Sequence, residues 1–337
     1  MLLSQFDFDL PSDLIAQYPR DQRDESRLMV VDRKTEEISE VTFRDLSSFL
    51  EPQDTLIFND TKVFPARLIG QKENGVKVEL LLVKELSKNT WEVLAKPGKK
   101  IKEGSKLLFS SNLKALVIRD FENSKVVKFE TDNLMQELDR IGIIPLPPYI
   151  KREKPDPNDR VTYQTVYAQN RGSIAAPTAG LHFTANLLQK LKEKGVHQEM
   201  LTLHVGLGTF QPIFHEKLSD HQMHEESFII PKETLKRLNE KRGRRICVGT
   251  TTLRALESSA SANGILKDSC TRTDIFIQPG YTFKYVEHLL TNFHLPKSTL
   301  FILISAFMGE SLAKKAYEIA VQKGFKFFSY GDAMLIL

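Results

Sequence analysis

The sequence predicts an α/β fold, in which a main domain with a mixed sheet carries an inserted small antiparallel β-barrel. In residues 1–62 and 150–337, apolar strand-like runs alternate with helical segments, which is typical of α/β domains. In residues 63–149, short alternating runs are separated by turn pairs such as Asn74-Gly75, which is typical of a small barrel. We therefore expect a discontinuous α/β domain from residues 1–62 and 150–337, and a barrel domain from residues 63–149.

The elements of the α/β domain follow from apolar runs and helical periodicity. Its N-terminal part offers strands at residues 28–32 and 55–62. In its C-terminal part we expect strands at residues 200–205, 246–249, 273–277 and 325–330, and helices at residues 187–194, 232–242, 253–260 and 310–323.

The composition is that of a soluble globular protein, with 41% apolar and 27% charged residues in a chain of 337. The longest apolar run, residues 300–308, is about half of the roughly 20 residues that a membrane span needs. The first residues lack the basic start and apolar region of a secretory signal. Cys247 and Cys270 form neither a disulfide framework nor a metal motif, so we expect a cytoplasmic protein.

Polar side chains end the predicted strand at residues 55–62. Asn59, Asp60, Thr61 and Lys62 directly follow its apolar part. The ends of strands are frequent ligand sites in α/β folds. We therefore expect these four residues to contact a ligand.

Two segments between residues 163 and 210 carry side chains that a core does not require. In residues 176–184, small residues surround a His and two hydroxyls before an amphipathic helix, and in residues 203–210 an apolar strand ends in two glycines. Strand ends, glycine turns and helix starts leave backbone N–H groups free to meet a ligand. The candidate site residues here are Thr178, His182, Phe183, Thr184, His204, Gly206, Gly208, Thr209 and Phe210.

The two glycines of the second segment also suggest part of a dinucleotide-binding turn. The complete G-x-G-x-x-G pattern is absent, because Gln211 occupies the position of the third glycine. A nicotinamide site is therefore disfavoured. Two alternatives stay open, a plain turn at the end of a strand and a turn that faces a ligand.

Residues 248–257 predict a strand, a turn and a helix start with three hydroxyls, those of Thr250, Thr251 and Thr252. Free N–H groups and the positive end of the helix dipole suit a carboxylate or a phosphate. The alternative is that Thr250 or Thr251 only caps the helix. Arg254 and Glu257 are further candidates, although their spacing also suits a surface ion pair.

Histidines gather in residues 215–226. His215, His221 and His224 lie there among acidic residues, but no cysteine accompanies them, so we expect no metal site. The alternatives for His224 and Glu225 are a pair that contacts the substrate and a solvated loop.

Residues 291–296 contain another histidine ahead of a buried apolar segment. Asn292 and His294 are the candidate site residues of this segment, whereas Phe293 by itself is more typical of a core.

Basic residues cluster at residues 96–102, 151–154 and 232–245. Most such clusters are solvated faces, but three of them on a chain of net charge +4 also suit a phosphate backbone. No pattern of a known RNA-binding or DNA-binding module accompanies them. A nucleic-acid partner is therefore permitted and not required.

Taken together, these stretches resemble one family, the S-adenosylmethionine:tRNA ribosyltransferase-isomerases of queuosine biosynthesis. Each motif alone has low specificity, but the ordered set extends over nearly the whole chain and includes Arg67. The matching stretches are residues 59–68, 145–150, 163–168, 176–184, 203–210, 223–226, 248–257, 289–300 and 328–334.

The resemblance implies an α/β domain with an inserted β-barrel, in agreement with the change of pattern near residues 63 and 150. It implies an enzyme that moves the ribosyl part of S-adenosylmethionine onto 7-aminomethyl-7-deazaguanine (preQ1) at the wobble position of tRNA. The products would be epoxyqueuosine-tRNA, adenine and methionine. S-adenosylmethionine would be consumed as a substrate, with no metal or other cofactor. The expected partners are S-adenosylmethionine and a tRNA anticodon stem-loop, and we expect a monomer.

This reaction requires a base that removes a C5′ proton beside the sulfonium, and an acid that protonates the departing adenine. A histidine suits the first task, and the hypothesis is that His182 or His204 performs it. His224 or Glu225 would handle adenine.

The substrate's charged groups predict further contacts. The methionine carboxylate suits Arg254 and the helix start at residues 250–252, and the sulfonium suits the face of Phe183 or Phe210. Asp60 and Lys62 are candidates for the aminomethyl group or ribose hydroxyls. The alternatives are a methyltransferase, which would leave S-adenosylhomocysteine, and a non-catalytic tRNA-binding module.

Overall fold

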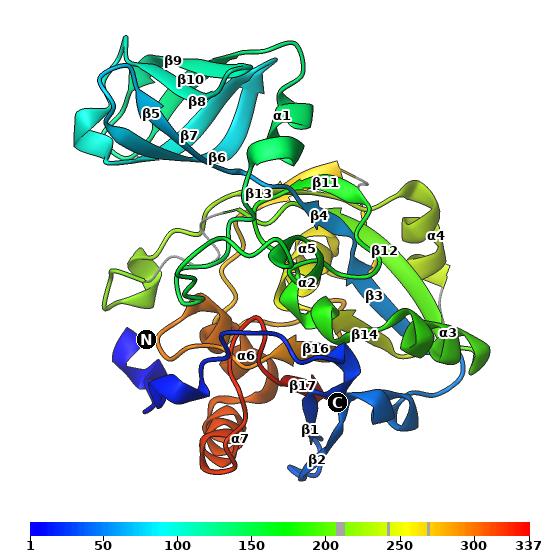
Figure 1. The fold of residues 1–337 in the computed structure, drawn as a ribbon. Helices are drawn as coiled ribbons and strands as arrows, with labels where there is room; N and C mark the ends of the chain where they lie inside the picture. The colour runs from blue at the N-terminus through cyan, green and yellow to red at the C-terminus, as the bar shows by residue number, and fades with distance from the viewer. Residues whose placement is uncertain (207–212, 241–242, 268–269) are drawn as a thin grey trace.

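The computed structural model describes residues 1–206, 213–240, 243–267 and 270–337. A large mixed sheet with helices around it forms the main body, and a closed antiparallel barrel stands at one end of it (Figure 1). The predicted fold class is therefore confirmed.

In the described residues the main sheet has nine strands, in the order β15-β13-β12-β3-β14-β16-β17-β1-β2. β12, β3, β14 and β16 are parallel, as are β17 and β1, and the other neighbours are antiparallel. The bounds are β1 Arg27–Val31, β2 Ile38–Thr42, β3 Thr55–Asn59, β12 His197–Leu203, β13 Glu226–Ile229, β14 Arg245–Val248, β15 Cys270–Thr273, β16 His288–Asn292 and β17 Ala333–Ile336.

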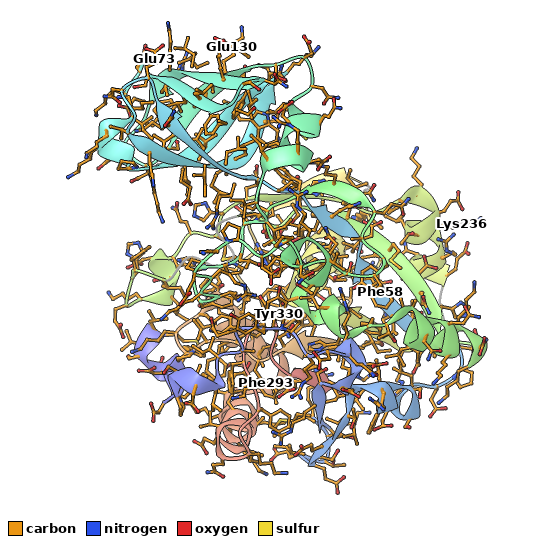
Figure 2. All side chains as sticks on the ribbon, in the orientation of Figure 1. Phe58, Glu73, Glu130, Lys236, Phe293 and Tyr330 are labelled. Atoms are coloured by element: carbon orange, nitrogen blue, oxygen red, sulfur yellow. The ribbon has the colours of Figure 1, made fainter. Side chains whose placement is uncertain are left out.

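Side chains cover both faces of this sheet. The central strand β3 is buried throughout; Ile57 packs into a core on one face, and Leu56 and Phe58 pack into another core on the opposite face. Because both faces are covered, the strand has a continuous apolar sequence with no polar alternation. Figure 2 shows the labelled Phe58 and Phe293 inside the main body, and Lys236 at its surface.

The helices around the sheet differ in polarity. α6 is apolar on nearly all sides and is almost entirely buried, whereas the lysines of α3 and α4 are exposed. None of the helices in the described residues combines the length and apolarity needed to cross a membrane. The helices are α1 Leu134–Ile141, α2 Asp159–Thr162, α3 Ala185–Glu193, α4 Lys232–Glu240, α5 Thr250–Ser259, α6 Thr299–Met308 and α7 Glu310–Gln322.

The barrel closes in the strand order β10-β7-β6-β5-β8-β9. Alternate side chains, such as Leu80 and Val93, fill its interior, while Glu73 and Glu130 project from its outside (Figure 2). A separate short pair, β4 Thr61–Val63 with β11 Asn170–Ser173, lies beside the main sheet. The barrel strands are β5 Arg67–Lys72, β6 Lys77–Ser87, β7 Thr90–Lys96, β8 Lys106–Ser110, β9 Leu113–Asp120 and β10 Lys125–Glu130.

The strand that we predicted at residues 325–330 is wrong. Phe325 and Phe327 are buried in alternation, as in a strand, but Phe328 has a positive φ of 72° and the chain turns there. The last strand is β17, and the segment before it is a loop held by Asp332, whose carboxylate accepts a hydrogen bond from the backbone N–H of Lys326 at 2.8 Å. Apolar alternation alone does not separate a strand from a loop whose aromatic side chains anchor it in the core.

Candidate active site

A cavity of about 580 Å³ lies where β14 and β16 end. These two strands are parallel, so their carboxyl ends meet at one edge of the sheet, which is the usual ligand site of such sheets. Of the predicted site residues, the cavity brings together Thr178, Thr250, Thr251, Asn292 and His294. No Asp or Glu is among the described residues that line it.

The start of α5 faces this cavity without a side-chain cap. Its N-cap residue is Gly249, with φ 92°, and no side chain caps the helix. The Thr251 hydroxyl is buried and has no hydrogen-bond partner, while the Thr252 hydroxyl donates to the carbonyl of Val248 at 2.8 Å. The alternative that Thr250 or Thr251 caps the helix is therefore wrong. The first N–H groups of α5 and one hydroxyl remain available to an anion.

Asn292 ends β16 in one fixed orientation. Its Nδ2 lies 3.1 Å from the Phe328 carbonyl and 3.0 Å from Nε2 of His182. The carbonyl can only accept, so the amide nitrogen has to lie on that side, and its second hydrogen goes to His182. Asn292 Oδ1 is buried and has no hydrogen-bond partner.

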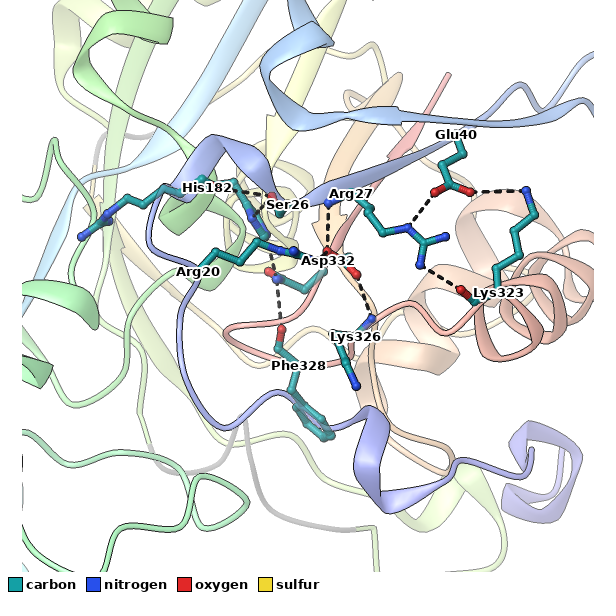
Figure 3. A network of polar contacts seen from close by, with 11 residues as sticks. Arg20, Ser26, Arg27, Glu40, His182, Lys323, Lys326, Phe328 and Asp332 are labelled. Carbon is teal, nitrogen blue, oxygen red and sulfur yellow. Dashed lines mark hydrogen bonds and ion pairs between the residues drawn. The ribbon is translucent and has the colours of Figure 1, made fainter.

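His182 is consequently a neutral imidazole with both nitrogens engaged. Nε2 accepts from Asn292, so Nδ1 carries the proton and donates to the Ser26 hydroxyl at 2.8 Å (Figure 3). Burial lowers the pKa of His182 to about 4, against the opposing charge of Asp332. Its ring also stacks on Phe43, with centroids 5.0 Å apart. A base role for His182 stays a prediction, and in this arrangement the imidazole has no free lone pair.

An aromatic pair forms one wall of the cavity. The rings of Tyr149 and Phe328 stack with centroids 3.9 Å apart, and Tyr149 Oη lies 2.6 Å from Ser329 Oγ. We did not predict either residue as part of the site. Both lie in stretches that carry the family resemblance, so the aromatic residues of these stretches were the available signal.

His294 also lines the cavity, near the start of α6. Its Nε2 lies 3.0 Å from the Thr291 hydroxyl, and its backbone N–H donates to Tyr317 Oη at 3.1 Å. Burial lowers the pKa of His294 to about 3. The ring is therefore neutral near pH 7.

His204 belongs to a second polar group, at the ends of β3 and β12. Its Nδ1 lies 2.8 Å from the Thr61 hydroxyl, and no described residue hydrogen-bonds its Nε2. The ring packs directly on Gly172, where an added Cβ would lie 2.6 Å from Cε1. Burial lowers the pKa of His204, and the nearby carboxylate of Asp60 opposes that shift.

Asp60 is a buried carboxylate of the same group. It accepts from Thr202 Oγ1 at 2.6 Å and from Asn170 Nδ2 at 3.0 Å, and no described cation pairs with it. Asn59, by contrast, bonds the backbone of Leu203 with both ends of its amide and therefore ties β3 to β12. Lys62 is exposed.

A smaller cavity of about 260 Å³ adjoins the first one, between the barrel and the main body. Two predicted residues, Arg67 and Gly206, line it together with Lys96. Pro148 lines both cavities. Neighbouring residues also divide between them, since Ala176 and Val205 line the first cavity and Ala175 and Gly206 line the second.

Two predicted residues lie in the packing around α3. Phe183 is fully buried, edge-on to Phe43 and Phe58 with centroids 5.1 Å apart in both cases, so it is a core residue and does not line the cavity. Thr184 is the N-cap of α3, where its hydroxyl accepts from the N–H of Leu187 at 3.1 Å.

Arg254 and Glu257 do not form the surface pair that their spacing suggested. Arg254 is buried against Glu226, with 2.5 Å between Nη1 and Oε2, and its Nη2 has no hydrogen-bond partner. Glu226 was absent from our predicted site. Strand alternation could have indicated it, because Phe228 points inward and Glu226 lies two residues before it.

Glu257 is fully buried and holds a loop. Its carboxylate accepts from Tyr281 Oη and from the backbone N–H groups of Lys284, Tyr285 and Val286, at 2.8–3.0 Å. Both oxygens of this carboxylate therefore hold the loop in place by accepting hydrogen bonds.

The pair proposed for adenine lies outside both cavities. His224 and Glu225 are exposed, and Glu225 pairs with Arg272 at 2.9 Å. Gly208, Thr209 and Phe210 lie outside the described residues. Within the described ranges, no group of three or more potential metal ligands of the His, Cys, Asp or Glu type occurs.

Comparison with known proteins supports the resemblance over the full length. A family model described as "Queuosine biosynthesis protein" matches residues 3–336. The chain belongs to this family. It is 48% identical to the S-adenosylmethionine:tRNA ribosyltransferase-isomerase of Halothermothrix orenii and 49% identical to that of Caldanaerobacter subterraneus, with all of each chain covered. The crystal structure of S-adenosylmethionine tRNA ribosyltransferase from Thermotoga maritima is 38% identical, with a TM-score of 0.57 over 99% of this chain and 100% of that one.

The buried Glu257 generates a stability prediction. Glu257→Gln places an amide NH₂ against backbone donors, so we expect the free energy of unfolding to fall by about 2–3 kcal/mol, as for charge-assisted hydrogen bonds. Urea denaturation measures this change. Glu240→Gln, at an exposed position of α4, is the matched control and should have no effect. Equal stability of the two variants would contradict the structural role.

Proposed function

We propose that this chain transfers the ribosyl part of S-adenosylmethionine onto preQ1 at the wobble position of tRNA and isomerises it. The products are epoxyqueuosine-tRNA, adenine and methionine. The observation that carries the proposal is the uncapped start of α5 at the edge of a 580 Å³ cavity, in a chain of the queuosine biosynthesis family.

The methionine part of the substrate fits the α5 end of the cavity. A carboxylate there would accept hydrogen bonds from the N–H groups of the first turn and from the unpartnered Thr251 hydroxyl. Because no described carboxylate lines the cavity, nothing on the described wall repels this anion. Arg254 lies one turn further along α5, is paired with Glu226 and does not line the cavity, so we assign the carboxylate to the helix start.

His204 has the freer imidazole of the two predicted bases. Neither histidine lines the two cavities, but His204 directly precedes Val205 and Gly206, which do. Its Nε2 is unoccupied among the described residues, whereas both nitrogens of His182 are engaged. Since burial holds the pKa of His204 below its usual value of 6.5, the imidazole is neutral and can accept a proton at pH 7. S-adenosylmethionine is consumed in the reaction, and we propose that no cofactor is needed.

The smaller cavity suits the tRNA nucleotide. It adjoins the S-adenosylmethionine cavity through Pro148, and the side chains of Arg67 and Lys96 line it. Glu79 lines it too and lies 3.6 Å from Arg67, so Lys96, and Arg67 on leaving this pair, would contact phosphates beside the modified base. The anticodon stem-loop would then lie between the barrel and the main body, with the chain acting as a monomer.

Product analysis tests the proposed function directly. The purified protein is incubated with S-adenosylmethionine and preQ1-containing tRNA, and the small molecules and tRNA bases are analysed by mass spectrometry. We expect free adenine, methionine and a heavier tRNA base. S-adenosylhomocysteine in their place would identify a methyltransferase and refute the proposal.

The base assignment predicts a pH dependence. Only neutral His204 accepts a proton, so kcat/KM should rise with pH through the lowered pKa of His204 and level off above 6.5. His204→Gln should lower kcat/KM by about 10²–10⁴-fold and remove this limb of the profile. A variant that retains the limb would assign the base elsewhere.

The tRNA contact predicts a salt dependence. If about five phosphates are bound, log affinity should fall with log salt at a slope of roughly −3.5 to −4.5. Arg67→Ala and Lys96→Ala should each make this slope shallower by about 0.7–0.9. Lys236→Ala, on the exposed side of α4, is the control (Figure 2). A change of slope in the control variant alone would show that the tRNA contacts α4 and not the smaller cavity.

A further inference from the structure

The wall of the cavity around Asn292 and Phe328 has two features that the fold does not require. Asn292 is 2% exposed, and its Oδ1 has no hydrogen-bond partner. A buried amide oxygen without a partner costs about 1–3 kcal/mol, so such groups are rare unless a ligand or water satisfies them. The second feature is Phe328, an aromatic residue with φ 72°. Left-handed backbone at a bulky residue costs about 1–3 kcal/mol and is concentrated at functional sites.

The surroundings of Asn292 prevent its amide from turning over. The Phe328 carbonyl and His182 Nε2 both take hydrogens of Nδ2, at 3.1 and 3.0 Å. If the amide were reversed, two oxygens would face each other at the Phe328 carbonyl. Oδ1 is therefore fixed as an acceptor, and a hydrogen-bond donor of a ligand or a water would satisfy it.

The loop that carries Phe328 is fixed as well. The buried carboxylate of Asp332 accepts from the N–H groups of Arg27 and Lys326 at 2.9 and 2.8 Å, and Arg20 Nη2 pairs with it at 3.0 Å (Figure 3). Phe328 also stacks on Tyr149 at 3.9 Å. The cavity thus has a rigid aromatic wall next to a fixed acceptor.

We propose that this wall binds the purine of the sulfonium substrate and reads its 6-amino group. The flat ring packs on the aromatic wall, and the exocyclic amine donates a hydrogen bond to Asn292 Oδ1. His182 is then a positioning residue. By accepting a hydrogen bond from Asn292 Nδ2, it keeps Oδ1 of the amide directed at the purine amine. This inference rests on the proposed function, and it orients the substrate with its carboxylate at α5 and its purine at Phe328.

The test compares S-adenosylmethionine with S-inosylmethionine, in which an oxygen acceptor replaces the amine. With saturating preQ1-tRNA, release of adenine or hypoxanthine gives kcat/KM for each. We expect the wild-type protein to prefer the amine by about 10–100-fold, the penalty for facing a buried acceptor with another acceptor. Asn292→Leu, of similar size, should reduce that preference to about threefold or less. A preference that is unchanged in Asn292→Leu would overturn the proposal.

His182→Phe tests the positioning role and serves if Asn292→Leu does not fold. It keeps the stacking on Phe43 and removes the acceptor for Asn292, so the purine preference should fall about 3–10-fold relative to wild type. His197→Phe is the matched control, because His197 is exposed and lies outside both cavities. Equal preferences in the two histidine variants would overturn the positioning role.

Phe328→Gly separates strain from function. Glycine adopts a φ of 72° without strain, so the lost ring packing should be partly offset and the melting temperature should change little. We expect KM for S-adenosylmethionine to rise about 10-fold or more, because one aromatic ring leaves the wall. An unchanged KM would refute the aromatic wall.

Two outcomes distinguish this inference from the proposed function. If the wild-type protein releases no adenine with preQ1-tRNA present, the proposed function fails, and the inference fails with it. If it releases adenine and hypoxanthine equally well, only the inference fails. An Asn292→Leu variant that loses tRNA affinity but keeps the purine preference would place the tRNA base at this wall. That result would also overturn the inference.

Discussion

The carboxylate of Asp332 is the constraint on which the site depends. Both of its oxygens accept hydrogen bonds from segments that are far apart in the chain, at Arg27 and Lys326. It therefore joins the start of β1 to the loop before β17 and fixes the position of Phe328. The Phe328 carbonyl in turn fixes Asn292, and Asn292 fixes the tautomer of His182. One buried charge thus orients a chain of neutral groups, of which Phe328 and Asn292 line the cavity.

The cavity itself is organised by polarity and not by ion pairs. The uncapped start of α5 forms one part of its wall, and the stacked rings of Tyr149 and Phe328 form another. The buried ion pair of Arg254 with Glu226 does not line it. A substrate with a carboxylate, a sulfonium and a flat base is suited to such a site, because a helix dipole and aromatic faces bind charge without a buried counter-ion.

The barrel contributes a second surface. It is joined to the main body beside the ends of β3 and β12, where His204 and Asp60 lie, and its residues Arg67 and Lys96 line the smaller cavity. A large nucleic acid held there would present one nucleotide to the neighbouring S-adenosylmethionine. On the proposed assignment, the insertion would bring two substrates of very different size to adjoining cavities.

The sequence by itself determined the fold class, the barrel insertion, the family and several residues of the cavity, among them Thr251 and Asn292. The family follows from the resemblance of the ordered set of motifs. The rest follows from local patterns, because strand alternation, glycine turns and helix starts depend on neighbouring residues. Tertiary structure decided the uses of the polar side chains. Phe183, Thr184 and Glu257 look like site residues in the sequence but serve the core, a helix cap and a loop. Phe328 was hidden in an apparent strand. Which buried polar atoms find partners depends on the pairing of strands far apart in the chain, and no local pattern records it.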